Sequence, residues 1–146
     1  MKKLIDVRKT LGILWYVALL ILVVIFSIQV QTNKYGNKYN LVIEWLTANV
    51  LPTISIITTA WVADFIKKTD EEQSIGIFQY RVVLIFSLMY LFLLFFPVLF
   101  SPFFEADTTP IELLAKMKVF LIPFQGLLDA FITFIFVTKT EKKEEA

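Results

Sequence analysis

The sequence predicts an all-α membrane protein, a four-transmembrane-helix bundle with both termini in the cytoplasm (N-in/C-in). Three observations lead to this fold class. Hydrophobic residues make up 58% of the 146 residues and charged residues only 18%, below the roughly 25% usual for soluble domains. The apolar residues gather in four segments, each near the ~20 residues that cross a bilayer. The basic residues gather in alternate connections between these segments.

The first apolar segment, 11–30, is uncharged and follows a basic amino-terminal stretch. A secretory signal peptide has a shorter apolar core, of about 7–15 residues, followed by a cleavage site of small residues. The residues after position 30 are Gln31, Thr32, Asn33 and Lys34, which do not form such a site. We therefore interpret 11–30 as an uncleaved first span.

The other three segments are 41–65, 82–100 and 119–137. The third is uncharged, as is the first. A helix of a soluble bundle needs a polar face toward water, and these two segments have none, which excludes a soluble bundle. Ahead of the last segment, Pro110 suits the first turn of a helix, so 110–118 either extends the fourth helix or lies in the interface.

Charges in the connections predict the orientation. Most of the 14 basic residues lie before the first span, between the second and third, or after the fourth. These residues are Lys2, Lys3, Arg8, Lys9, Lys67, Lys68, Arg81, Lys139, Lys142 and Lys143. The positive-inside rule places that side in the cytoplasm, which predicts a multi-pass protein of the plasma or inner membrane. The connections are too short for a soluble domain, so 1–146 is one tetraspan domain and 139–146 a short charged cytoplasmic tail.

Composition also limits the chemistry. The chain has no cysteine and no histidine, which excludes a disulfide scaffold, zinc sites built from those residues, Cys-based or Ser–His nucleophile systems and histidine-bound haem. The net charge of +1 is no electrostatic footprint for nucleic acid. We expect no catalytic residues, no cofactor, no metal and no nucleic-acid partner. The expected protein is not an enzyme.

Asp129 is the most informative residue of the sequence. It lies near the middle of the fourth span, where a carboxylate costs about 2.5–3.5 kcal/mol on insertion scales. Gln125 and Thr133 are one helical turn away on the same face. Asp129 is either a functional carboxylate, as membrane acids are by default, or a hydrogen-bonded residue that only fixes helix packing. Pro123 and Gly126 predict a bent, closely approached helix here.

The second span carries the other polar residues. A stripe of small residues recurs at helical spacing along it: Ala48, Pro52, Ser55, Thr59 and Ala63. Such a stripe is typical of a helix–helix seam, and Ser55, Thr59 and Ala63 are the packing residues we expect. The alternative is a polar wall along a pathway. Both interpretations place the second span inside the bundle, and Pro52 should free a carbonyl there for a hydroxyl or water.

Similar depths in the second and fourth spans predict one intramembrane polar site. If these helices touch, it comprises Asn49, Thr53, Gln125, Asp129 and Thr133. Charged residues at the span ends are candidates for an outer mouth, formed by Glu44, Lys116 and Lys118, and an inner mouth at Asp64. Snorkelling and interfacial ion pairs are the alternatives for these residues. The phenylalanine-rich third span is expected to be the most exposed to lipid or an oligomer face.

Two hypotheses of function follow. In the first, the protein is an oligomeric membrane protein, either a pore or permeability-altering subunit or the membrane-embedded sensor or anchor of a larger complex. Its partners would be the bilayer, further copies of itself and a cytoplasmic protein. Tetraspan size and topology are similar to those of small membrane subunits of bacterial defence and lysis systems, a resemblance that implies a class and no residue roles. The alternative is a small proton- or ion-coupled transporter with Asp129 as the coupling carboxylate.

Overall fold

The computed structural model describes residues 1–67, 74–104 and 108–137, without the side chains of 63–67 and 137. Four helices in this part of the chain are long and apolar enough to cross a membrane. They are α1 (Leu4–Gln31), α2 (Tyr39–Lys67), α3 (Ile77–Phe100) and α4 (Pro110–Val137). The protein is therefore a multi-pass membrane protein of four helices, as predicted from the apolar segments.

Each helix is longer than the apolar segment that predicted it, because helical geometry continues into the polar residues at its ends. The fourth helix begins at Pro110 and runs without interruption to Val137. Thr109 and Glu112 form a reciprocal capping box: the Thr109 N–H donates to Glu112 Oε2 (3.1 Å) and the Glu112 N–H donates to Thr109 Oγ1 (3.3 Å). This pair satisfies two of the free N–H groups at the helix start. Residues 110–118 thus extend α4, and the tail 139–146 lies outside the described residues.

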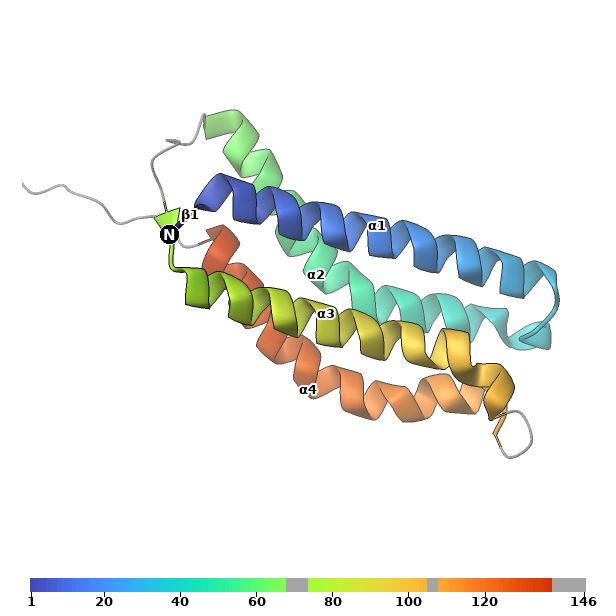
Figure 1. The fold of residues 1–146 in the computed structure, drawn as a ribbon. Coiled ribbons are helices and arrows are strands. Elements are labelled where there is room, and N and C mark those ends of the chain that lie inside the picture. The colour runs from blue at the N-terminus through green and yellow to red at the C-terminus, as the bar shows by residue number, and fades with distance from the viewer. Residues whose placement is uncertain (68–73, 105–107, 138–146) are drawn as a thin grey trace, which may run out of the picture.

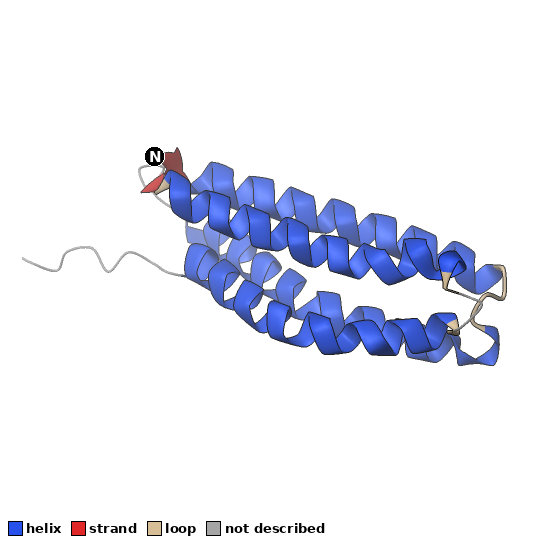
Figure 2. Cartoon of the chain, turned by 60° about the horizontal axis from the view of Figure 1, so that its bottom comes forward, coloured by secondary structure: helices blue, strands red, loops and turns tan. Residues whose placement is uncertain are grey.

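The helices form a ring in the order α1, α2, α4, α3. In Figure 1, α1 and α3 form the layer nearer the viewer, with α2 and α4 behind them. Neighbours α1 and α3 run in the same direction, as do α2 and α4, and Figure 2 shows the four helices packed lengthwise. We call the end at which α1 begins and α4 finishes the terminal end, and the opposite end the far end.

Short elements close the two ends of the bundle. At the terminal end, β1 (Lys2–Lys3) pairs antiparallel with β2 (Ser74–Ile75), the residues just ahead of α3. At the far end lie the 3₁₀ helices η1 (Gly36–Lys38) and η2 (Ser101–Phe103). The small sheet was not expected from the sequence, and it holds the amino terminus against the start of α3.

Hydrogen bonds join α1 and the residues after it to α3 and η2 at the far end. The Gln29 amide nitrogen donates to the Val98 carbonyl (3.2 Å), and the Tyr35 hydroxyl donates to Gln29 Oε1. The Lys34 ammonium donates to the Ser101 hydroxyl. Burial raises the pKa of Tyr35 from its ordinary 10 to about 12, so its hydroxyl stays a donor well above neutral pH.

The core runs along the axis of the ring, and all four helices contribute to it. Its fully buried side chains include Trp15, Leu22, Ile57, Tyr90, Leu94 and Leu128. Of the α3 span 39% is buried, the same share as of α2, against 28% of α4. The expectation that the third helix is the most exposed was therefore wrong, and α2 is no more interior than α3. In a ring of four helices each can bury only one face, and α3 buries its own through Tyr90 and Leu94.

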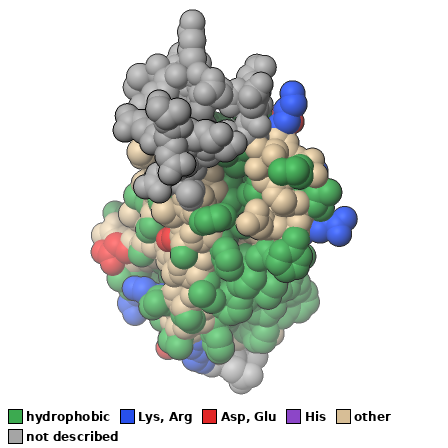
Figure 3. Space-filling view, turned by 90° about the vertical axis from the view of Figure 1, so that its left-hand side faces the viewer, with side chains coloured by type: hydrophobic (Ala, Val, Ile, Leu, Met, Phe, Trp, Pro, Cys, Tyr) green, Lys and Arg blue, Asp and Glu red, His purple; other side chains and the backbone are tan. Residues whose placement is uncertain are grey.

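Large apolar side chains are exposed on the outer surface of both layers. The α1–α3 layer exposes many large apolar side chains, among them Ile13, Leu20, Leu88 and Phe92. Figure 3 views the terminal end, and green hydrophobic side chains cover its lower right, the side of the α1–α3 layer. Tan polar or backbone atoms and red acidic atoms show on the left, the side of α2 and α4. An apolar surface suits contact with lipid tails, and α4 also exposes large apolar side chains, among them Val119, Phe120 and Ile122.

One glycine permits a close contact between α1 and α2. A Cβ added to Gly12 would lie 1.9 Å from the Trp61 ring, so the indole lies directly on the α1 backbone. Tyr16, one turn along α1, stacks on Trp61 with ring centroids 5.3 Å apart and meets the Thr58 hydroxyl at 2.6 Å. Within this chain nothing approaches Gly126 closely, because a Cβ there would meet nothing within 4 Å.

Candidate functional site

The centre of the site is a hydrogen bond between α2 and α4. The Thr53 hydroxyl donates to Asp129 Oδ1 at 2.6 Å. Thr53 is fully buried, whereas Asp129 is half-buried, so the carboxylate lies at the outer edge of the seam between the helices. The sequence interpretation required these helices to touch, and they lie side by side in the ring.

One turn away, Gln125 contacts the backbone of α2. Pro52 has no N–H, so the helix cannot supply the usual donor, four residues on, to the Ala48 carbonyl. The Gln125 side-chain amide donates to that carbonyl from α4, at 3.4 Å, the long end of the hydrogen-bond range. The carbonyl freed by the proline is therefore met by an amide of the neighbouring helix and not by a Ser or Thr of its own helix.

Asn49 faces the bundle axis and not Asp129. Its side-chain amide nitrogen donates to the Trp45 backbone carbonyl within α2 at 2.6 Å. The backbone carbonyl of Asn49 accepts from the Tyr90 hydroxyl of α3 at 2.8 Å. The Trp45 indole N–H in turn donates to the Leu114 carbonyl of α4 at 2.9 Å. Asn49 is buried, and its bonds tie α2 to α3. Of the predicted cluster, the structure thus pairs Thr53 with Asp129 and places Asn49 in a separate contact.

The small-residue stripe of α2 lies on the outside of the bundle. Ala48, Pro52, Ser55 and Thr59 are all exposed, so the stripe does not lie in the core of its own chain. Residues three or four apart share one helix face, and the contact of Ala48 with Gln125 shows that this face borders α4. The hydroxyls of Ser55 and Thr59 are therefore turned away from the core of their own chain. The side chain of Ala63, the third predicted packing residue, lies outside the described part.

Thr133 extends the exposed surface along α4. It is exposed, as is Gly126, and both are close in sequence to Asp129 on the same helix. We define the α2–α4 polar face as the exposed or half-buried residues that border this seam: Ser55, Thr59, Gly126, Asp129 and Thr133. This face combines small side chains, hydroxyls and one carboxylate at the depth of the spans.

The predicted mouths lie apart from this centre. Glu44, Lys116 and Lys118 are exposed residues toward the far end of α2 and α4. At 1.5 Å per residue, Lys118 and Asp129 are about 16 Å apart along the helix axis. The structure therefore does not join them into one cluster. Asp64, the inner-mouth candidate, belongs to the last turns of α2, whose side chains lie outside the described residues.

Sequence reasoning missed Arg8. It is buried, with 6% of its surface exposed. Its Nε and one terminal nitrogen, Nη2, both donate to the Ile135 carbonyl, at 3.2 and 3.1 Å. The same Nη2 also donates to the Phe136 carbonyl, at 3.0 Å. These carbonyls belong to the last turn of α4, where helical donors are lacking. The sequence did contain an indication that Arg8 is buried. Arg8 precedes Leu11 by three residues and Trp15 by seven, and this spacing places it on the buried face of α1.

The contacts of the site are hydrogen bonds between α2 and α4. Among the described residues, no three Asp, Glu, His or Cys side chains come together to hold a metal ion. Comparison of the chain with protein-family models, curated proteins and solved structures finds no match.

Proposed function

We propose that this chain is a non-enzymatic subunit of a homo-oligomeric membrane assembly that alters the permeability of its membrane. The observation that carries the proposal is the position of Asp129. Its carboxylate is half-buried, bonded to Thr53, and lies at the outer edge of the α2–α4 seam near mid-span. A carboxylate in that position costs several kcal/mol if it contacts lipid tails. Protein or water must therefore meet this side of the bundle.

The rest of the α2–α4 polar face supports a protein contact. Ser55, Thr59 and Thr133 expose hydroxyls beside Asp129, and Gly126 has open space where a Cβ would lie. Small residues allow the backbones of neighbouring helices to approach closely, and hydroxyls bond across such contacts. A second copy packed here, or a water path between copies lined by this face, would satisfy every one of these groups.

The proposed orientation has both termini in the cytoplasm. An even number of spans brings the start of α1 and the end of α4 to the terminal end, and the basic residues Lys2, Lys3, Arg8, Lys9 and Arg81 belong to that end. Positive charge of this kind is retained on the cytoplasmic side. The same end would offer the attachment point for a cytoplasmic protein if the assembly serves as the sensor or anchor of a larger, defence-type complex.

A small proton- or ion-coupled transporter is the second candidate. The observation that favours it is again the hydrogen bond between Asp129 and Thr53. This bond can form in both protonation states of Asp129. The Thr53 hydroxyl donates to the ionised carboxylate, and it can accept a hydrogen bond from the neutral carboxyl group. In a transporter, the charge of this residue is needed in each cycle. In a packing contact, the shape and hydrogen bonding of the residue suffice.

Reconstituted liposomes test the proposal. The protein is examined for oligomer mass in several mild detergents and nanodiscs, and for release of entrapped ions and small dyes from vesicles. The variants are Asp129→Asn, the face variant Thr59→Trp, and Leu127→Ala as the matched control, since Leu127 lies two residues from Asp129 and is 54% exposed.

The outcomes separate the hypotheses. A permeability subunit forms an oligomer and releases solute, Thr59→Trp weakens both, and Leu127→Ala changes neither. A transporter shows flux driven by a pH or ion gradient that Asp129→Asn abolishes while folding is kept. An oligomer without flux supports the sensor or anchor and contradicts the pore. A monomer under every condition overturns the proposal.

A further inference from the structure

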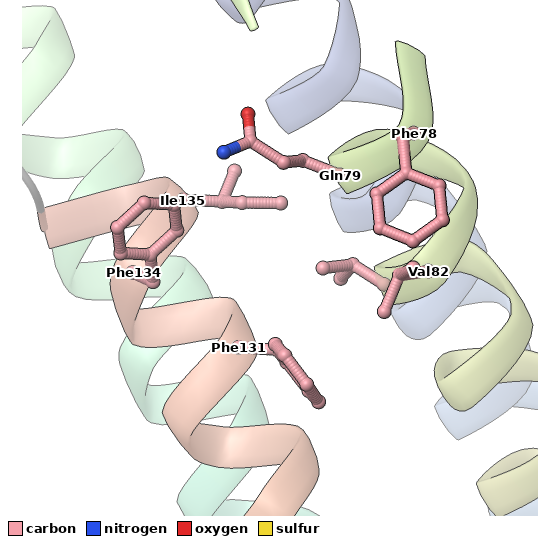
Figure 4. Close-up of a pocket in the computed structure, with 7 residues that line it drawn as sticks. Phe78, Gln79, Val82, Phe131, Phe134 and Ile135 are labelled. Carbon is pink, nitrogen blue, oxygen red and sulfur yellow. The ribbon is translucent and has the colours of Figure 1, made fainter. Parts of the chain in front are cut away.

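The terminal end holds an apolar groove between α3 and α4. Its volume is about 380 Å³, at the low end of the roughly 300–1,000 Å³ of small-molecule sites. Figure 4 shows the labelled side chains bordering this space from both helices. The lining consists of Phe78, Gln79, Val82, Val83, Phe131, Phe134 and Ile135. Gln79 is the only polar side chain among them.

Two contacts hold the α4 wall of the groove in place. The carbonyl of Ile135, whose side chain lines the groove, accepts two hydrogen bonds from the buried Arg8. Deeper in the groove, the Phe131 ring packs on Phe86 of α3 with centroids 5.2 Å apart. The first contact fixes the end of α4, and the second holds α4 against α3. The groove is therefore part of the folded bundle and needs no rearrangement to form.

The position of the groove in the membrane indicates an apolar occupant. It lies along the first turns of the α3 span and the last turns of the α4 span. Phe78 is 78% exposed and Phe134 is 52% exposed, so the groove opens to the outside of the bundle, where these spans meet lipid. Apolar cavities do not hold water. An acyl chain from the adjoining leaflet can enter from the side and fill it.

Positive charges lie at the same end of the bundle as the groove. The Lys2 ammonium lies 4.2 Å from the ring centroid of Tyr80, the residue next to Gln79. Pairing of β1 with β2 holds Lys2 and Lys3 at this end, and Arg81, the residue after Tyr80, is exposed. Asp6, in the first turn of α1, is exposed at the same end. Lys2, Lys3 and Arg81 are exposed at this end, and basic residues near a membrane surface attract anionic lipid headgroups.

Gln79 completes the polar rim. Its Oε1 accepts a hydrogen bond from the Gly76 N–H at 3.2 Å, which orients the amide at the start of α3. With the oxygen engaged, the amide nitrogen is the donor that the lining offers at the mouth. A phosphate oxygen accepts from such a donor. The groove thus has an apolar depth and a donor at its rim, and cations lie at the same end of the bundle.

We propose that this groove binds one acyl chain of an anionic glycerophospholipid of the surrounding leaflet. The chain lies against Val82 and Phe131, and the phosphate lies near Gln79, Lys2 and Arg81. Binding here does not depend on the permeability function proposed above, because it involves another helix pair and another surface. It would make anionic lipid a resident component of the protein.

Photolabelling in vesicles tests the proposal. The full-length protein is reconstituted in phosphatidylcholine with a minor fraction of phosphatidylglycerol, one or the other carrying a diazirine in its acyl chain, and labelled residues are located by mass spectrometry. The groove variant is Val82→Trp and its matched control is Leu88→Trp, on an exposed part of the same helix. The charge variant is Arg81→Gln and its control is Lys118→Gln, an exposed residue toward the far end.

We expect labels from phosphatidylglycerol to concentrate on Val82, Phe131 and Phe134. Val82→Trp should remove most of this labelling and Leu88→Trp should not. Arg81→Gln should lower the preference for phosphatidylglycerol about fivefold, the factor expected for one basic residue at an anionic surface, and Lys118→Gln should leave it unchanged. Labels spread evenly over the exposed helices, equal labelling by both lipids, or protection of the groove by a second copy would each overturn the proposal. Wild-type labelling positions decide the matter even if Val82→Trp does not fold.

Discussion

The Gln125 amide on α4 donates to the Ala48 carbonyl on α2, the acceptor that Pro52 leaves without its helical donor. The backbone hydrogen bond that Pro52 removes from α2 is thus replaced by one from a side chain of the neighbouring helix α4. One turn along the seam, Thr53 donates to Asp129. The two contacts together fix how α2 and α4 are rotated against one another, and this rotation decides which residues of both helices face outward.

A double-mutant cycle tests the first contact. Gln125→Ala should lower the free energy of unfolding by about 0.6 kcal/mol, the average for polar contacts between membrane helices. In a Pro52→Ala background the new backbone N–H can bond Ala48, so Gln125→Ala should cost less. The measurement is unfolding in mixed micelles. The same cycle with Pro97→Ala serves as the control, because Pro97 lies in α3 and Gln125 bonds α2. If Gln125→Ala costs the same stability in the wild-type, Pro52→Ala and Pro97→Ala backgrounds, Gln125 does not compensate for Pro52.

Arg8 should stabilise the terminal end of the bundle. Arg8→Ala removes the donors to the Ile135 and Phe136 carbonyls, and a hydrogen bond from a charged group contributes about 1.5–3 kcal/mol. We expect a loss in that range, measured by thermal unfolding in detergent. The exposed neighbour supplies the control, Lys9→Ala, which should change little. Arg8→Lys should retain only part of this stability, since an ammonium lacks the planar fork of donors. Wild-type stability in Arg8→Lys would show that the positive charge alone is responsible.

Gly12 and Gly126 should respond to alanine in opposite ways. At Gly12 the methyl group would overlap the Trp61 ring, and overpacking of this kind costs about 1–3 kcal/mol. At Gly126 the methyl group meets open space, and alanine is up to about 1 kcal/mol better than glycine in a helix. Unfolding midpoints of both variants give the comparison. Trp61→Ala should relieve the loss from Gly12→Ala, and its failure to do so would show that the close contact is not the cause.

The orientation of the chain can be measured directly, because the native sequence has no cysteine. Single cysteines at Lys38 and Glu105 should react with a membrane-impermeant reagent added outside intact cells, and one at Lys142 should react only after lysis. The reason is the bias of basic residues toward the terminal side. Labelling of the Lys142 position in intact cells would reverse the proposed topology.

The sequence alone determined the number of helices and the depth of their polar residues. Hydropathy measures how each segment partitions into the bilayer, a property that depends on its own residues. For this reason the four spans were predicted correctly, and Thr53 and Asp129 were placed at similar depths before their contact was known.

Only the tertiary structure decided which face of each helix is buried. In a soluble helix the polar face marks the outside, but these helices are apolar nearly all round, because lipid tails and a protein core are similar surroundings. The rotation of α2 therefore could not be derived from its pattern, and Ser55 and Thr59 proved to face outward. Arg8 was missed for a related reason. Its basic charge suggested the solvated tail, whereas free carbonyls of α4, more than a hundred residues away in the chain, give it a buried place.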